Sequence, residues 1–422
     1  MKNKTNSLLI VVFMLLGTLL LATGASGQTP AGTAAQTTKY AITDIGTLGG
    51  NNSAPSWITK SGDVVGASET GQFDAFGNAI VHAFQWRQGV IGDLGTLGDI
   101  YSAGFGGNNQ GMAVGYNSYN INHALLWHDG TTTDLGTLVG PNGFSLAQQV
   151  NDQGQAVGYS QASDGTFHAV LWSHGRISDL GTLGGPDSST FSLANGINDL
   201  GQIVGDAQQD TISNPLLGFA PFFPTLWDKG SVTKLSGEPS YAFAGDAFSI
   251  NSKSQVVGRI AVADPNEGAV GHAYFWESGV MRDLGVPAGD DNSEANSLND
   301  LGQVVGDSGV GFILSYSPDR ALLWQNGEMI DLNTLIPANS GYHLIKAFDV
   351  NARGQIAVCT VEQSTGNIHA ALLTPQASSI VGNAVAPTVG VSGVMPRLSE
   401  HARRLLTLAR DKKVGFRTQP NN

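Results

Sequence analysis

The stretches HAVLWSHGRISDLGTLGG, residues 168–185, and NDLGQIVG, residues 198–205, decide the fold of this 422-residue chain. They contain three motifs, H-A-x-x-W, D-L-G-T-L and N-x-x-G-Q-x-V-G, which alternate in a fixed order along the sequence. Each motif occurs seven times when weaker copies are counted, with a period of about 48 residues. A fixed period of this size indicates repeated supersecondary units that pack on one another.

The spacing between the motifs predicts short antiparallel strands. From the motif tryptophan to the next glycine is always three residues, as from Trp86 to Gly89, and four more residues lead to the aspartate position. This rigid spacing predicts a hairpin, because glycine adopts the positive φ that tight turns require. The Asn-Asp-x-Gly stretch predicts a second tight turn. Each unit therefore has four strands, A to D, with short A–B and C–D turns and variable B–C and D–A loops.

The two ends of the repeat array predict a closed ring. The first copy begins with strand D at Tyr40, and the last copy stops with strand C at Leu373. Pairing between these incomplete copies completes one unit and removes two exposed strand edges. Four-stranded units are typical of propeller blades, whereas a solenoid needs capping units. We predict an all-β, seven-bladed β-propeller of four-stranded blades over residues 40–376, closed by pairing of the N-terminal strand D with the C-terminal strands A to C.

Together the three motifs resemble the HAF-repeat family of predicted extracellular proteins. The resemblance covers about residues 40–374. It implies secretion and a propeller-like fold, but no established reaction and no catalytic residues. The departures from the pattern are local: Phe223-Pro224 stands in place of His-Ala, Lys234 in place of the aspartate, and Arg320 in place of a histidine.

The N-terminal segment predicts export. Lys2 and Lys4 precede an apolar run from Leu8 to Ala22, and small residues follow at 25–27, as in a cleaved signal peptide. The run is shorter than the roughly 20 residues of a membrane-spanning helix. We predict a signal peptide at 1–27, a short linker at 28–39 and a periplasmic or extracellular location. An uncleaved membrane anchor is the alternative.

The C-terminal segment differs in composition from the repeats. Residues 377–396 are rich in Gly, Val, Ala and Ser, as in a flexible linker. Residues 397–413 combine an apolar stripe with surrounding Lys and Arg, which predicts a basic amphipathic helix, and residues 414–422 are expected to be a disordered end. The helix either docks on the propeller or contacts an anionic envelope surface.

Charge and cysteine content limit the classes of function. Between residues 28 and 376, 12 Lys and Arg stand against 32 Asp and Glu, a net charge of −20. Such an acidic surface argues against nucleic acid as a partner, since phosphates require a basic surface. Cys359 is the only cysteine, so no disulfide can form within the chain. Its apolar neighbours predict a buried thiol. We expect a monomer.

The repeat histidines and tryptophans are predicted to be structural. A ring spreads one histidine per blade apart, whereas zinc needs three or four ligands around one point. We expect each histidine to form a hydrogen bond within its blade, for example with an aspartate of strand D. We expect each tryptophan to pack between blades. These residues are His82, His123, His168, His272, His369, Trp86, Trp127, Trp172, Trp227, Trp276 and Trp324.

No catalytic signature is present in the sequence. It has no G-x-S-x-G or H-E-x-x-H motif and no Cys–His pairing, so we predict no catalytic residues and no organic cofactor. Asp290, Asp291 and Glu294 lie within five residues and could bind calcium through carboxylate oxygens. They match no calcium-loop motif, so solvated loop charges are the alternative.

The variable loops are the expected binding site. Both kinds of variable loop lie on one face of a propeller, and binding residues commonly occupy loops held by a rigid scaffold. The apolar loop between Gly205 and Phe223 either contacts a partner or covers the channel. The candidate residues are Tyr101, Tyr119, Asp187, Phe219, Phe222 and Tyr241. We expect a non-enzymatic binding scaffold for an extracellular glycan or protein. A propeller enzyme, for example a glycan hydrolase or lyase, and a structural cell-surface protein are the alternatives.

Overall fold

The computed structural model describes residues 38–118, 122–185, 189–313 and 317–376. Several predictions concern residues outside these ranges: the signal peptide 1–27, nearly all of the linker 28–39, the three segments after residue 376, Tyr119 and Asp187. In the described part, no helix has the length and apolarity needed to cross a membrane.

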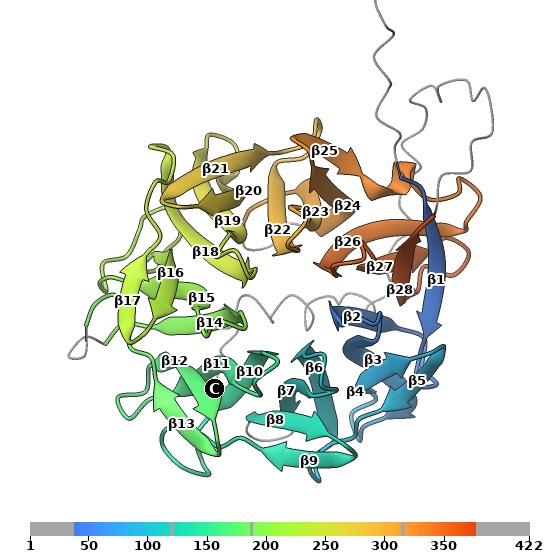
Figure 1. The fold of residues 1–422 in the computed structure, drawn as a ribbon, viewed down its shortest axis with the longest axis horizontal. Coiled ribbons are helices and arrows are strands. Elements are labelled where there is room, and N and C mark those ends of the chain that lie inside the picture. Colours follow the sequence, from blue (N-terminus) through green and yellow to red (C-terminus); the bar gives the residue numbers. More distant parts are fainter. Residues whose placement is uncertain (1–37, 119–121, 186–188, 314–316, 377–422) are drawn as a thin grey trace, which may run out of the picture. The chain divides into compact units, whose positions relative to one another are not determined.

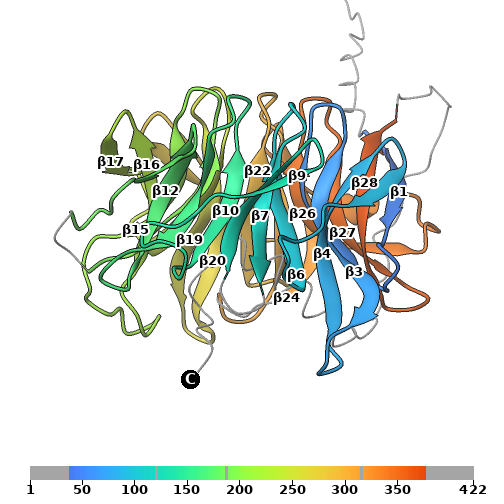
Figure 2. The ribbon, with the colours of Figure 1, turned by 90° about the horizontal axis from the view of Figure 1, so that it is seen from below.

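The described residues form seven four-stranded antiparallel sheets around a central axis, which is the predicted seven-bladed β-propeller (Figure 1). In each sheet, strand A lies next to the axis and strand D at the rim. Seen from the side, the strands run between the two faces of the disc, so turns and loops collect at the faces (Figure 2). The A–B and C–D turns share one face, here named the turn face, and the B–C and D–A loops share the other, the loop face.

The strand bounds follow the repeat. Strands A are β2 (Ser53–Ile58), β6 (Tyr101–Gly107), β10 (Ser145–Val150), β14 (Ser192–Ile197), β18 (Ala242–Ile250), β22 (Asn292–Leu298) and β26 (Tyr342–Val350). Strands B are β3 (Val64–Phe73), β7 (Ala113–Ser118), β11 (Ala156–Gln161), β15 (Ile203–Gln208), β19 (Val256–Asp264), β23 (Val304–Val310) and β27 (Ile356–Glu362). Strands C are β4 (Ala79–Arg87), β8 (His123–His128), β12 (Phe167–Ser173), β16 (Phe222–Asp228), β20 (Gly268–Glu277), β24 (Ser317–Gln325) and β28 (Ile368–Pro375). Strands D are β5 (Val90–Asp93), β9 (Thr131–Asp134), β13 (Arg176–Asp179), β17 (Ser231–Lys234), β21 (Val280–Gly285), β25 (Glu328–Asp331) and β1 (Tyr40–Gly46), and a 3-10 turn, η1 (Leu332–Thr334), follows β25.

Blades 1 to 6 each contain four consecutive strands, from β2–β5 to β22–β25, and blade 7 contains β26, β27, β28 and β1. The N-terminal strand β1 pairs with the C-terminal strand β28 from Tyr40 opposite Pro375 to Gly46 opposite Ala370. The predicted closure of the ring by its two ends is therefore confirmed. It satisfies backbone groups that an open array would leave at two edges.

The C–D turns explain the fixed spacing from tryptophan to glycine. Gln88 and Gly89 both have positive φ angles, 49° and 86°, as in the two-residue type I′ turns that match the twist of paired strands. The same pair of positive φ angles recurs at Asp129–Gly130, His174–Gly175, Lys229–Gly230, Ser278–Gly279 and Asn326–Gly327. Because the loop has two residues in each hairpin, the spacing cannot vary without changing the turn type.

Every strand A contains a β-bulge at the same place. In β10, Ala147 pairs with Gly158 and Gln149 pairs with Val157, so Gln148 has no partner in the ladder. Such an extra residue bends the strand locally and redirects its side chain. The seven bulge residues are Ser56, Phe105, Gln148, Asn195, Phe248, Asn296 and Phe348. They lie on the strands nearest the axis, one per blade.

The asparagine that begins each A–B turn links its blade to the next. Asn299 Nδ2 donates to the carbonyl oxygen of Asn351 at 2.9 Å, and Asn351 Nδ2 donates to the carbonyl of Thr59 in blade 1 at 2.9 Å. The same bond joins blades 2 to 6, from Asn108, Asn151, Asn198 and Asn251. The Oδ1 atom of each asparagine also accepts backbone N–H groups of its own turn, as Asn299 does from Leu301 and Gln303. These residues form a chain of bonds, the asparagine ring, that runs around the axis.

The motif tryptophans make a second set of contacts between blades. Trp172 Nε1 donates to the carbonyl of Gly136 in the preceding blade at 3.3 Å, and Trp227 and Trp324 repeat this bond to Gly181 and Leu284. These three indoles are 3–6% exposed. Burial of such large side chains between sheets contributes much of the packing energy of a domain.

Candidate functional site

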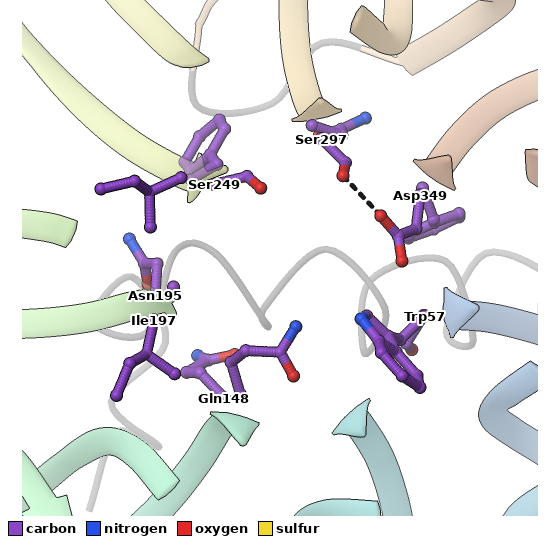
Figure 3. A pocket seen from close by; sticks show the side chains of 14 residues that line it. Trp57, Gln148, Asn195, Ile197, Ser249, Ser297 and Asp349 are labelled. Carbon is purple, nitrogen blue, oxygen red and sulfur yellow. Dashed lines mark hydrogen bonds between the residues drawn. The ribbon is translucent and has the colours of Figure 1, made fainter. Parts of the chain in front are cut away.

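A polar pocket lies on the propeller axis. It is lined by the bulge residues of six blades and by the residues that follow them, which Figure 3 shows from close by. The lining residues are Ser56, Trp57, Gln148, Gln149, Asn195, Gly196, Ile197, Phe248, Ser249, Ile250, Asn296, Ser297, Phe348 and Asp349. Blade 2 supplies none of them, and it has glycine at 106, the position after its bulge. About 60 Å³ of the pocket is open to the centres of water-sized molecules, so the space between the side chains is larger than this volume.

Two amide oxygens in this pocket have no hydrogen-bond partner among the described residues. They are Gln148 Oε1 and Asn195 Oδ1, on side chains of residues that are 1% and 7% exposed. The Asn195 amide has one orientation only, because its nitrogen faces two acceptors, Asp206 Oδ1 at 2.6 Å and the Ala247 carbonyl at 3.0 Å. Buried acceptors of this kind normally have partners. Both oxygens therefore keep unused hydrogen-bond acceptor capacity.

The carboxylate of Asp349 is held at the edge of the pocket by protein donors. Its oxygens accept the backbone N–H groups of Ile58 at 3.0 Å and Val350 at 2.9 Å. The Ser297 hydroxyl donates to the same carboxylate, as the dashed line in Figure 3 marks. Gln149 has a similar role in blade 3, where its Oε1 accepts from the N–H groups of Gly107 and Val150. These side chains satisfy backbone groups near the bulges.

A buried cluster of charged side chains lies two residues before the bulge residues in blades 5 to 7 and on the neighbouring B strands. Arg259 pairs with Asp246 at 2.5 Å and with Glu294, and Lys346 lies 3.3 Å from Glu294 and 2.7 Å from Asp307. The Arg259 side chain is 1% exposed. Buried charges are costly unless they are paired. The extended ion pairs identify this cluster as a structural network.

The layer of strand A residues that contains this cluster separates the pocket from the loop face. Its members in blades 1 to 4 are apolar: Ala54, Ala103, Leu146 and Leu193, which are 1–5% exposed. In blades 6 and 7 Glu294 and Lys346 are also buried, and the Asp246 side chain in blade 5 is 13% exposed. Since strand A runs from the loop face to the turn face, the pocket lies on the turn-face side of this layer.

The loop face carries most of the exposed large hydrophobic side chains. Of twelve among the described residues, eight lie in B–C or D–A loops or at the strand ends that enter them. These eight are Phe73, Phe76, Leu97, Val139, Ile212, Leu216, Tyr241 and Val310. The four on the turn face are Val90, Leu200, Val280 and Leu301. Phe76 at 86% and Ile212 at 73% are the most exposed of the twelve.

No family model matches the sequence, and a comparison with curated proteins finds no match. Solved structures are similar in fold. Oligogalacturonate lyase from Vibrio parahaemolyticus has a TM-score of 0.49 at 10% identity, covering 79% of this chain and 93% of its own. The β-propeller domain of the Trilobed protease from Pyrococcus furiosus has a TM-score of 0.46 at 8% identity, covering 76% and 93%. YCF48 from Cyanidioschyzon merolae has a TM-score of 0.43 at 11% identity, covering 79% of this chain and 99% of its own. These likenesses concern the fold alone.

The repeat histidines lie at the rim of the loop face, each with the aspartate at or near the end of strand D of its blade. The five distances from Nδ1 to Asp Oδ2 are 2.6–2.8 Å, for His82–Asp93, His123–Asp134, His168–Asp179, His272–Asp283 and His369–Asp44. In His82 the second ring nitrogen lies 3.2 Å from the Ile100 carbonyl, in the loop that leads to the next blade. The hydrogen bond to Asp93 raises the pKa of His82. The other carboxylate oxygen of each aspartate accepts the N–H of the glycine two residues further on, so each pair anchors the start of a D–A loop.

The departures from the repeat are compensated locally. In blade 4, Phe223 and Lys234 take the places of histidine and aspartate, and Lys234 Nζ lies 4.0 Å from the centre of the Phe223 ring. A cation–π contact therefore replaces the ion pair. In blade 6, Arg320 lies 3.4 Å from Asp290 in the preceding D–A loop.

The predicted binding residues have mixed surroundings. Tyr101 is partly buried and donates to Asp74 at 2.7 Å, and Tyr241, 53% exposed, donates to Asp283 at 2.8 Å. Partial burial and that bond raise the pKa of Tyr241 to about 12. Phe219 and Phe222 are partly buried, with ring centres 6.5 Å apart. These residues occupy the loop face, and their role in binding stays a prediction.

The long loop of blade 4, between β15 and β16, was predicted either to contact a partner or to cover the channel. Leu217 packs against Ala261, Ala269 and Ile313 of blades 5 and 6, while Ile212 and Leu216 remain exposed. One part of the loop therefore covers its neighbours, and another part is open to a partner.

The three calcium candidates do not share one site. Asp290 accepts from the Ser308 hydroxyl at 2.6 Å, Asp291 accepts from the Gly311 N–H at 3.2 Å, and Glu294 belongs to the buried charged cluster. Across residues 38–376, leaving aside the three short gaps, no group of three or more His, Cys, Asp or Glu side chains is arranged to hold a metal. Calcium binding stays a prediction.

Cys359 is buried in blade 7, as the sequence predicted. Burial raises the pKa of its thiol well above the ordinary value. Burial with a raised pKa is typical of a structural cysteine.

The axial pocket was not found from the sequence. The sequence placed binding on the loops, whereas the pocket is formed by inner strands. The sequence does contain one indication of this pocket. Gln148, Gln149 and Asn195 are polar residues within strands that a propeller buries next to its axis. Alignment of the seven repeats on the turn asparagine places all bulge residues three positions before it.

Proposed function

We propose that this protein is a secreted, non-enzymatic binding protein that holds a partner protein on the loop face of its propeller. The observation that carries the proposal is the concentration of exposed apolar side chains there, eight of the twelve among the described residues. Contiguous exposed apolar groups mark interaction surfaces, and the loop face has two pairs that each share one loop, Phe73 with Phe76 and Ile212 with Leu216. Loops on a rigid scaffold are where binding residues commonly lie.

The chemistry of these side chains favours a protein partner over a glycan. Phe73 and Phe76 project from one hairpin, between β3 and β4, and Ile212 and Leu216 share the loop between β15 and β16. Such side chains suit apolar segments of another protein, because apolar burial drives most protein association. The net charge of −20 on residues 28–376 favours a neutral or basic partner.

The location and the absence of catalysis are parts of the same proposal. The apolar run and small residues before Gln28 support export, and the motifs support membership of the HAF-repeat family. The channel carboxylates Glu294 and Asp307 are engaged by Lys346. Carboxylates held in ion pairs favour a structural role over acid–base catalysis.

Paired surface variants test the proposal. The full chain is immobilised and exposed to the envelope and secreted proteins of the source cells, and captured proteins are identified by mass spectrometry. A partner held by the loop face should be retained by the wild type and by Leu200→Ser/Leu301→Ser on the turn face. It should be lost with Phe76→Ser/Ile212→Ser. Equal capture by both double variants contradicts the proposal, and self-assembly detected by light scattering would favour a structural surface role.

A further inference from the structure

We propose that the axial pocket binds a neutral, hydroxyl-rich ligand, the terminal sugar of a glycan, from the turn face. This site is separate from the loop face and does not depend on the proposed function. It is formed by residues of six blades, so it exists only in the closed ring.

The unpaired acceptors define what the ligand must supply. Gln148 and Asn195 line the pocket, and their Oε1 and Oδ1 atoms have no partner among the described residues; the Asn195 amide cannot rotate without losing its bonds to Asp206 and Ala247. An unpaired buried acceptor is unfavourable, so the site favours molecules that donate hydrogen bonds. Hydroxyl groups of a sugar donate and also accept, which suits the Ser249 hydroxyl beside them.

Apolar side chains from four blades form part of the pocket wall. Trp57, Phe248 and Phe348 line it together with Ile197 and Ile250. Trp57 is partly exposed, and Figure 3 shows its indole on the side of the pocket opposite Asn195. A sugar ring presents C–H groups on its faces and hydroxyl groups around its edge, so it can use this wall and the amides at once. An amphipathic aromatic surface with a few placed polar groups is typical of small-molecule sites.

The charges near the pocket exclude other ligand classes. No Lys or Arg is among its lining residues, so nothing there would neutralise an anion. Asp349 is the one carboxylate in the lining, and its oxygens accept from Ile58, Val350 and Ser297. A carboxylate directed at protein donors is a weak ligand for a cation. The ligand class that remains is a neutral molecule that donates hydrogen bonds.

Gln148 provides a test that keeps the fold intact. Methionine has a similar length and no polar oxygen, so Gln148→Met removes an unpaired buried acceptor and should leave the melting temperature unchanged or raise it. The full chain is screened on a glycan array and titrated with D-glucose, D-galactose, D-mannose and N-acetyl-D-glucosamine, in phosphate buffer without glycerol. We expect at least one saccharide to bind the wild type, and Gln148→Met to weaken it at least about tenfold. Trp57→Leu should weaken the same saccharide.

The loop-face variant Phe76→Ser/Ile212→Ser is the matched control. It should bind the saccharide as the wild type does, so failure of this proposal and failure of the loop-face proposal are seen separately. Three results would overturn the sugar site: no saccharide binds, Gln148→Met binds as tightly as the wild type, or methylammonium binds in place of sugars.

Discussion

The innermost layer of the propeller differs between its two halves. Two residues before the bulge, blades 1 to 4 have Ala54, Ala103, Leu146 and Leu193, whereas blades 5 to 7 have Asp246, Glu294 and Lys346. The neighbouring B strands repeat the contrast: Ala67, Tyr116 and Tyr159 lie in blades 1 to 3, and Asp206, Arg259 and Asp307 lie in blades 4 to 6. We call these the apolar half and the charged half.

The backbone frame is the same in both halves. The bulge occurs in every strand A, and the asparagine ring passes from Asn108 in the apolar half to Asn351 in the charged half. The repeat motifs therefore specify turns and links between blades, and the channel side chains are free to differ. In the apolar half burial itself is favourable, whereas in the charged half stability depends on mutual pairing.

The largest expected effect follows from breaking that pairing. Arg259→Met fills the space of the aliphatic part of the side chain but leaves Asp246 and Glu294 without the guanidinium that now pairs with both. Removal of one partner from a buried ion pair costs about 3–5 kcal/mol. The free energy of unfolding is measured by urea denaturation, followed by tryptophan fluorescence.

Leu146→Met is the matched change in the apolar half and should cost less than about 1.5 kcal/mol. Adding Asp246→Asn and Glu294→Gln to Arg259→Met should restore most of the loss, because no unpaired charge remains buried. Similar destabilisation by Arg259→Met and Leu146→Met would show that the two halves are held together in the same way.

The blade framework could be predicted because it depends on local chemistry. The turn from Trp86 to Gly89 needs a residue of positive φ, and the glycine that supplies it is visible in the sequence. Ring closure followed from the offset of the first and last strands, β1 and β28. These features involve few residues at fixed separations, so the repeat carries them.

The links across blades could not be predicted in the same way. Asn351 bonds to Thr59, 292 residues away, and Arg259 meets Glu294 from the next blade. Such contacts depend on where the bulges direct side chains around the axis. The turn asparagine was read as a local turn residue, although its Nδ2 atom also joins neighbouring blades. The axial pocket was missed for the same reason, since Gln148 and Asn195 are brought together by ring geometry.

A smaller effect is expected at the rim of blade 4, which lies between the two halves and departs from the histidine–aspartate pattern. Phe223→His and Lys234→Asp together restore the pair found in the apolar half, because Thr225 opposite Lys234 matches the register of Phe84 opposite Asp93. Either change alone loses the cation–π contact, and Lys234→Asp also places a carboxylate near Glu238. A double-mutant cycle should give a favourable coupling of about 1 kcal/mol. Additive effects would mean that the two positions do not interact.

The smallest expected effect is a pH dependence at the rim of the apolar half. Hydrogen bonds to Asp93 and Asp179 raise the pKa values of His82 and His168 above 6.5. Their contribution to stability is therefore fully present below about pH 6.5 and is lost as the pH rises through the folded-state pKa. Burial alone would raise the pKa of Asp93, but bonds from His82 and the Gly95 N–H lower it below 3.8, so its contribution is lost only in stronger acid.

The melting temperature of the wild type should therefore fall between about pH 6 and pH 8.5, with the slope carried partly by these two histidines. His82→Asn/His168→Asn keeps an amide donor near each aspartate but removes the titrating ring, so its melting temperature should fall less over the same range. The aspartate side chains are 44% and 41% exposed, so solvent screening keeps the difference small. Parallel curves for the two proteins would show that these pairs position the D–A loops without contributing charge-dependent stability.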